Sequence, residues 1–170
     1  SNDCRVNIKD TQKKMGDLHV HIGKVEKGSL RINQSVNLEI NTDRRNNARA
    51  YHSATHLLHE ALRRTLGKHV AQKGSLVSPE KLRFDFSHNK PIEIKEIEKI
   101  EKHVNEMIDT FSDVETRIMT PKEAVDKGAL AMFGEKYGEE VRILSMGKVN
   151  ANYFSTELCG GTHVKNTKDI

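Results

Sequence analysis

The sequence predicts an α+β fold in which helices pack on an antiparallel or mixed sheet, preceded by a partial small β-barrel. Three observations predict it: alternating apolar residues between positions 18 and 40, helical periodicity in two later segments, and short alternating runs between and after them. Helices and strands in this order are typical of an α+β layer. We expect two domains, residues 1–42 as the C-terminal part of the barrel and residues 43–170 as the main domain.

The barrel segment is expected to contain strands at residues 18–22, 30–32 and 36–40, with a turn at Gly28. Two or three such strands cannot bury a core alone, so their partners are expected outside this sequence. The start at Ser1, without a methionine, also suggests a chain cut from a longer protein.

The main domain opens with a predicted helix over residues 48–66, which Gly67 ends. Its core face is expected to hold Tyr51, Ala54, Leu58, Ala61, Leu62 and Thr65. A second amphipathic helix is predicted after Pro91, and a capping box at Thr120 opens a short third helix. Strands are expected at residues 82–86, 114–119, 141–146 and 153–157.

The composition narrows the class of protein. Of 170 residues, 35% are hydrophobic and 31% are charged, and no apolar run is long enough to cross a bilayer. A soluble globular protein with no membrane partner is therefore expected. Cys4 and Cys159 are the only cysteines, so a disulfide framework is excluded and a reducing, cytoplasmic setting is favoured. The net charge of +4 favours a polyanionic partner only slightly.

Two short motifs carry the chemistry. The run HSATH places two imidazoles one helical turn apart, a spacing that can chelate one cation. The run CGGTH supplies a thiolate and a third imidazole from a turn that its glycines allow to fold tightly. Three histidines and one thiolate suit zinc, with one ion per chain. The predicted ligands are His52, His56, Cys159 and His163.

Other interpretations of these motifs stay open. Histidines beside a core face are usually only hydrogen-bonded, and CGGTH can be a simple turn. A nucleophilic Cys-His pair would leave the helical histidines unexplained. A thermolysin-like protease is excluded because position 53 is Ser rather than the glutamate of H-E-x-x-H. A purely structural zinc is the strongest rival, because four protein ligands can close the coordination shell.

Several motifs together resemble, in order and spacing, the editing domain of bacterial alanyl-tRNA synthetases. They are HSATHLLH from His52, QKGSL from Gln72, RFDFSH from Arg83, LAMFGEKY from Leu130 and ELCGGTH from Glu157. The resemblance covers nearly the whole chain, and residues 10–13 and 19–28 look like the end of the β-barrel domain that precedes the editing domain.

The resemblance implies an aminoacyl-tRNA deacylase, an enzyme that hydrolyses the ester of seryl- or glycyl-tRNA(Ala). A synthetic pocket for alanine cannot exclude glycine and rejects an added hydroxyl only weakly, so a second, hydrolytic pocket is needed. It implies the acceptor end of tRNA(Ala) as partner, with no role for DNA. ATP and Mg²⁺ would serve only the parent enzyme's aminoacylation site, which these residues lack. Two alternatives are a non-catalytic, zinc-stabilised tRNA-binding module and a free-standing trans-editing deacylase.

The resemblance also places residues around the predicted metal. Thr55, Gln72 and Ser75 are expected in the substrate pocket, and His59 and His88 as groups that support the ligands or act as a base. Basic residues around the first helix could contact acceptor-stem phosphates. These are Arg44, Arg45, Arg49, Arg63, Arg64 and Lys68.

Overall fold

The computed structural model describes residues 4–130 and 138–170, and the chain divides into two compact units, Ser1–Ile40 and Asn41–Ile170. The motif that begins at Leu130 lies, after its first residue, outside the described part of the chain. Within the described ranges, no helix combines the length and the apolar character needed to cross a bilayer.

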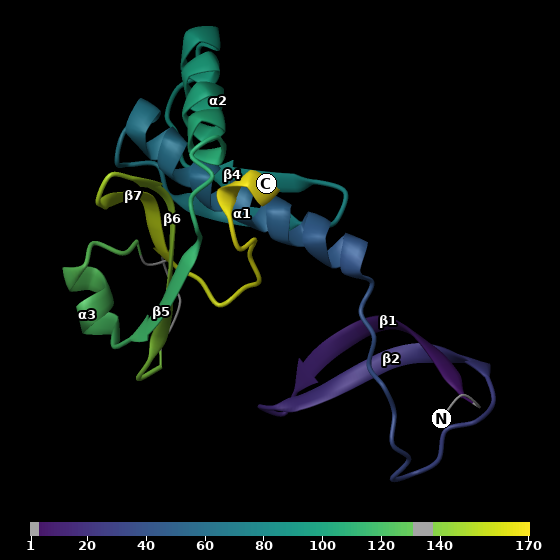
Figure 1. Ribbon diagram of the computed structural model, residues 1–170. Helices are drawn as coiled ribbons and strands as arrows, with labels where there is room; N and C mark the ends of the chain where they lie inside the picture. The colour runs from purple at the N-terminus through teal and green to yellow at the C-terminus, as the bar shows by residue number, and fades with distance from the viewer. Residues whose placement is uncertain (1–3, 131–137) are drawn as a thin grey trace. The chain divides into compact units, whose positions relative to one another are not determined.

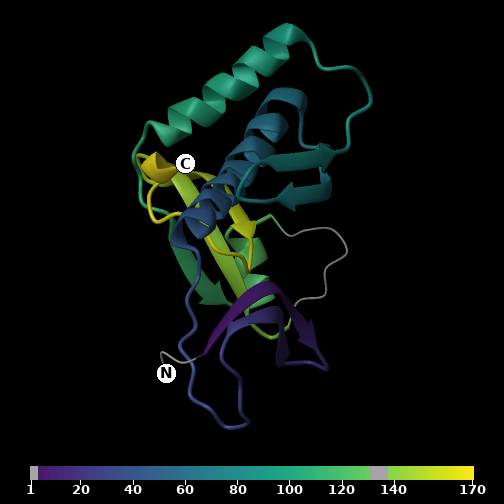
Figure 2. The ribbon, with the colours of Figure 1, turned by 90° about the vertical axis from the view of Figure 1, so that its right-hand side faces the viewer.

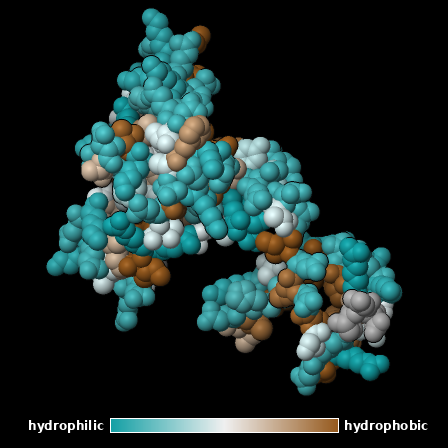
Figure 3. Space-filling view, in the orientation of Figure 1, coloured by the Kyte–Doolittle hydropathy of each residue, from teal (hydrophilic) through white to brown (hydrophobic). Residues whose placement is uncertain are grey.

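The first unit is a two-stranded antiparallel hairpin of β1 (Arg5–Lys14) and β2 (Leu18–Lys27) (Figure 1). The strands predicted at residues 30–32 and 36–40 are wrong, because residues 29–40 form no strand. Apolar side chains in this segment are exposed instead, Ile32 at 94% and Leu38 at 72%. Figure 3 shows brown, hydrophobic surface over this unit. Alternation alone was misleading here, because a strand also needs a neighbouring strand to pair with.

The second unit opens with the long helix α1 (Thr42–Leu66), which begins six residues before the predicted start at Ala48. The Asn41 side chain caps it by accepting a hydrogen bond from the Arg44 amide at 2.9 Å. Gly67 ends it at φ 121°, a backbone conformation that favours glycine. The first turns are polar and largely exposed, so they carry no apolar periodicity that could have revealed them.

The most buried face of α1 differs in part from the predicted one. Ala61 and Leu62 are buried as predicted, but Ser53 and Leu57 are also fully buried, whereas Tyr51 and Leu58 are only partly buried. The cause is that α1 packs against several elements at once, which include α2 (Ile94–Ile108), the hairpin of β3 (Gln72–Val77) and β4 (Leu82–Phe86), and β7 (Asn152–Leu158). A helix enclosed in this way buries its histidine stripe as well as its apolar stripe.

A three-stranded antiparallel sheet supports α1 and α2, in the order β5 (Glu115–Met119), β6 (Val141–Val149) and β7. Alternate residues of β6 serve two hydrophobic clusters, since Leu144 and Met146 pack with α1 and α2. Val141 and Ile143 pack with the short helix α3 (Pro121–Asp126) on the other face. Figures 1 and 2 show α1 and α2 on one side of the sheet and α3 near the end of β5.

The predicted α+β class is confirmed in its coarse form, as helices with antiparallel sheets. The strand predictions from residue 82 onward and the capping box at Thr120 are confirmed. β3 was missed, because its sequence QKGSLV has a glycine and little alternation. A single-turn helix, η1 (Thr167–Asp169), ends the chain beside α2.

Candidate metal centre

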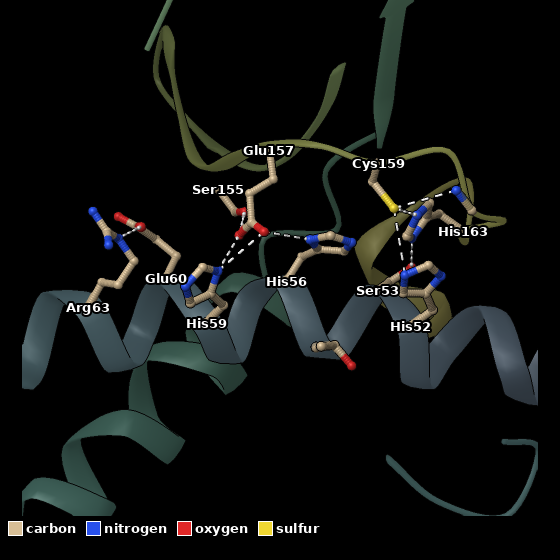
Figure 4. A network of polar contacts seen from close by, with 12 residues as sticks. His52, Ser53, His56, His59, Glu60, Arg63, Ser155, Glu157, Cys159 and His163 are labelled. Atoms are coloured by element: carbon tan, nitrogen blue, oxygen red, sulfur yellow. Dashed lines mark hydrogen bonds and ion pairs between the residues drawn. The ribbon is translucent and has the colours of Figure 1, made fainter. Parts of the chain in front are cut away.

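Four side chains converge where α1 meets the segment that follows β7. The donor atoms of this four-residue cluster, which we call the donor cluster, all lie within 4.8 Å of one another. Cys159 Sγ lies 3.3 Å from His163 Nε2 and 3.6 Å from His52 Nε2 (Figure 4). The cluster consists of His52, His56, Cys159 and His163.

The protonated nitrogen of His163 is fixed by Ser53. Ser53 Oγ donates its one proton to the Arg49 carbonyl oxygen at 2.8 Å, so it can only accept from its other neighbours. It accepts from the Val164 amide at 3.2 Å and lies 3.3 Å from His163 Nδ1. His163 Nδ1 therefore carries the proton, and its Nε2 lone pair faces Cys159.

His56 is oriented in the same way by Glu157. His56 Nδ1 donates to Glu157 Oε2 at 2.9 Å, and both side chains are buried. His56 Nε2 is buried and has no hydrogen-bond partner within the described residues. A carboxylate behind the ligating imidazole is the usual way in which proteins fix the nitrogen that binds a metal.

The side chains of Cys159 and His56 change each other's pKa values even without a bound cation. Burial raises the pKa of the Cys159 thiol, but the close contacts of its sulfur with the surrounding imidazoles outweigh burial and bring the pKa to about 3. Burial lowers the pKa of His56, yet the nearby Cys159 thiolate and the hydrogen bond to Glu157 raise it to about 9. The cluster therefore holds a thiolate that needs a positive partner, which a proton on His56 or a metal ion can supply.

Gly161 within the CGGTH turn and Arg142 on β6 shape this turn. Gly161 lies against the His52 ring so closely that a side chain there would overlap it, whereas a side chain at Gly160 would meet nothing within 4 Å. Arg142 on β6 donates to the Cys159 carbonyl oxygen at 2.8 Å and also to the Gly161 carbonyl oxygen. These contacts hold the thiolate and the His163 ring on one side of the turn.

The chemistry of the donor set suits zinc, and two of its donor separations match a tetrahedral site. Zinc bonds of about 2.0–2.1 Å to nitrogen and about 2.3 Å to sulfur place neighbouring ligand atoms about 3.3–3.6 Å apart. The two Sγ to Nε2 separations, 3.3 and 3.6 Å, match that spacing. The unpartnered Nε2 of His56 gains in such a site the partner that it otherwise lacks.

The predicted pocket residues occupy two elements. Thr55 is buried on α1, and its hydroxyl donates to the Tyr51 carbonyl oxygen at 2.8 Å. Gln72 is half-buried and Ser75 is exposed, and both lie on β3. The β3–β4 hairpin packs against α1, and the rings of Phe84 and His59 lie 5.3 Å apart.

The two additional histidines differ in their surroundings. His59 Nδ1 lies 3.3 Å from the Glu157 carboxylate, so Glu157 links His59 to His56. Burial raises the pKa of Glu157, but its hydrogen bonds with these two histidines lower it to about 2. His88 instead lies 3.0 Å from His69, with the two rings stacked. The structure therefore connects His59 to the donor cluster through Glu157 and pairs His88 with His69 instead.

The predicted tRNA-contacting residues also separate into groups. Arg63 donates to the Lys68 and Val70 carbonyl oxygens, and Arg64 bonds Glu60 and stacks over Phe154. These two guanidinium groups stabilise the fold. Arg44 forms an exposed ion pair with Glu80, and Arg45 and Arg49 lie on the first turns of α1.

Sequence reasoning missed three residues of the site: Ser53, Arg142 and Glu157. Glu157 was part of a quoted motif, but its role needs a buried carboxylate opposite α1. A pattern search for an acidic residue two positions before the cysteine could have found it. Arg142 and Ser53 offer no such signal, because they act through tertiary contacts.

Comparisons with known proteins show which proteins this chain is similar to. A family model described as "Threonyl and Alanyl tRNA synthetase second additional domain" matches residues 141–170. The chain is 57% identical over 164 residues to the alanine–tRNA ligase of Parvibaculum lavamentivorans, across 95% of this chain and 18% of the relative. It is 55% identical over 171 residues to that of Mesorhizobium japonicum, across 97% and 19%. The alanine–tRNA ligase of Granulibacter bethesdensis is 55% identical over 172 residues, across 99% and 20%. The chain thus spans about a fifth of the length of these relatives.

Proposed function

Because this chain corresponds to the editing region of alanyl-tRNA synthetases, we propose that it hydrolyses the ester bond of tRNA(Ala) mischarged with serine or glycine. In this proposal residues 43–170 form the editing domain, and residues 1–42 are the end of a β-barrel domain. The partner is the acceptor end of tRNA(Ala), and the reaction takes place in the cytoplasm.

The observation that carries the proposal is the convergence of four donor atoms within 4.8 Å, from one helix and one turn. Three imidazoles and one thiolate are a donor set that zinc prefers. Zinc bound there would supply Lewis-acid chemistry, by polarising the ester carbonyl or by activating water. His56 and His163 would hold it through Nε2 atoms whose direction is set by Glu157 and Ser53.

Hydrolysis requires a base that takes a proton from the attacking water, and His59 is the side chain best suited to this role. Its Nδ1 faces the Glu157 carboxylate, and its Nε2 is buried with no hydrogen-bond partner in the described part of the chain. We assign to this Nε2 the role of accepting a proton from water as the water oxygen attacks the ester carbon. The bond between that carbon and the ribose oxygen then breaks, and the proton passes to the ribose oxygen. The products are the free amino acid and tRNA with a free terminal hydroxyl.

A second candidate is a tRNA-binding module in which zinc is only structural. The presence of four donor residues favours this candidate, because four protein ligands can complete a tetrahedral shell and leave no position for water. The two candidates differ in the expected effect of metal removal. Removal of a structural zinc would unfold the domain, whereas removal of a catalytic zinc would abolish hydrolysis in a domain that stays folded.

The proposal is tested by comparing hydrolysis of seryl-tRNA(Ala) with that of alanyl-tRNA(Ala), together with a metal assay. We expect selective release of serine, about one zinc per chain, and loss of both in a His52→Ala, Cys159→Ala double variant. Bound zinc without any release of serine would favour the structural candidate. Equal release of serine and alanine would contradict an editing role.

A further inference from the structure

A polar cavity is lined by residues 161–163 of the CGGTH turn and by residues of α1, β5 and β6. Its volume is about 260 Å³, room for several groups the size of a water molecule. His163 of the donor cluster is one of its walls, so the cavity adjoins the candidate metal centre. Other lining residues are Arg49, Thr116, Arg142, Thr162 and Lys165, and we call this cavity the basic pocket.

The basic pocket is positively charged and lacks acidic lining residues among those described. The acidic residue nearest to it along β5 is Glu115, which neighbours Thr116. Glu115 is engaged by Arg117 at 2.9 Å and Lys148 at 3.3 Å, so its charge is already compensated. Arg49, Arg142 and Lys165 form no ion pair within the described residues. Arg142 already donates to two carbonyl oxygens of the turn, so Arg49 and Lys165 are the charges best placed to bind an anion.

The Arg49 side chain gives independent evidence for a ligand, because one of its buried N–H donors has no hydrogen-bond acceptor among the described residues. Its Nη1 reaches Asn46 Oδ1 at 3.3 Å, but its Nε is buried and has no hydrogen-bond partner in the described ranges. A buried guanidinium donor without an acceptor is costly, so such a group usually has an unseen partner. A phosphate oxygen is a suitable acceptor, because the guanidinium fork matches phosphate geometry.

We propose that the basic pocket binds an internucleotide phosphate at the 3′ end of an RNA strand. The identity of the ligand rests on the proposed function, because an ester of the last ribose held at the donor cluster lies one sugar away from that phosphate. His163 would then separate the two subsites, with the reacting ester on one side and the phosphate on the other. Hydroxyls of Thr116 and Thr162 are further donors for its oxygens.

The pocket is tested with two model esters that differ by one cytidine nucleotide and therefore by the internucleotide phosphate. The first is 3′-O-seryl-adenosine, and the second is the seryl ester of the dinucleotide cytidylyl-adenosine. The test variant is Arg49→Gln, Lys165→Gln, and the control with the same charge change is Lys99→Gln, Lys168→Gln, both exposed and outside the pocket. Arg142 is left intact because it also holds the Cys159 turn.

We expect the test variant to lower kcat/KM for the dinucleotide ester at least about 10-fold more than for the adenosine ester. The control should lower both equally and only slightly. Equal losses for both esters in the test variant, or no loss, would overturn the proposal. If the unsubstituted protein hydrolyses neither ester, the binding measurement alone decides on the pocket, and the editing function is decided separately by hydrolysis of seryl-tRNA(Ala).

The binding measurement is an NMR titration with uncharged cytidylyl-adenosine. Amide shifts at residues 161–165 that disappear in the test variant and persist in the control would support the pocket. Absence of shifts in the parent protein would overturn it, whether or not the esters are hydrolysed. Equal shifts with inorganic phosphate at the same concentration would identify a general anion site and overturn the assignment to RNA.

Discussion

The His56 imidazole donates from Nδ1 to the Glu157 carboxylate at 2.9 Å, and both groups are buried. This contact joins the HSATH helix to the strand that leads into CGGTH. It also leaves His56 Nε2 facing the donor cluster. The two sequence motifs are therefore coupled by a residue that belongs to neither pair of predicted ligands.

Replacing the carboxylate should weaken metal binding. In Glu157→Gln the side chain keeps its shape but loses the charge that fixes the His56 proton, so we expect zinc affinity to fall about 10- to 100-fold. Competition with a fluorescent zinc chelator measures this change. Glu140→Gln removes an exposed carboxylate and is the control. An unchanged zinc affinity in Glu157→Gln would contradict the role of this contact.

Two substitutions of His59 should separate its roles. The amide of His59→Asn can replace the Nδ1 donor to Glu157 but offers no base at the Nε2 position. We expect zinc binding close to that of the parent, with seryl-tRNA(Ala) hydrolysis reduced about 10²-fold or more. His59→Ala should lose hydrolysis and also bind zinc more weakly. If His59→Asn retains full activity, His59 is a positioning residue only.

The two glycines of CGGTH should differ in their tolerance of alanine. A methyl group at Gly161 would overlap the His52 ring, so Gly161→Ala should displace that ligand and lower the zinc content of the purified protein. Gly160→Ala places its methyl group in open space and is a matched control. Metal analysis and thermal unfolding of both variants check this prediction. Equal zinc contents would mean that His52 is not held against the turn as described.

Neighbouring leucines on α1 test the orientation of the helix. Leu57 is fully buried, so Leu57→Ala should lower the free energy of unfolding by about 2–5 kcal/mol. Leu58 is partly buried, and Leu58→Ala should cost less. Urea unfolding measures both values. The opposite order would restore the helical face predicted from the sequence.

The sequence was informative where local chemistry decides the outcome. The capping box at Thr120 and the end of α1 at Gly67 depend on local sequence, which shows them directly. The two motifs that contain the four predicted ligands are also local, but the approach of their donor atoms to within 4.8 Å depends on a tertiary contact. Tertiary contacts decided the rest. The burial of Leu57, the strand at Gln72–Val77 and the pairing of His88 with His69 depend on neighbours distant in the chain.

The same distinction explains the errors in the first unit. Residues 30–32 and 36–40 alternate as strands do, but no described strand pairs with them. Arg5–Lys14 has mainly polar residues and was overlooked as a strand, yet it pairs along the whole of β2. Backbone pairing is not encoded in the hydrophobicity of one segment, so the pattern could not distinguish these two cases.

The central claim is that the donor cluster binds one zinc ion on which hydrolysis depends, and stepwise zinc addition tests it most directly. Protein freed of metal with a chelator, and shown by circular dichroism to remain folded, is titrated with zinc while serine release from seryl-tRNA(Ala) is measured. We predict that the rate rises linearly and levels off at about one zinc per chain, with no response in His52→Ala, Cys159→Ala. Full activity in the folded, metal-free protein would contradict the claim.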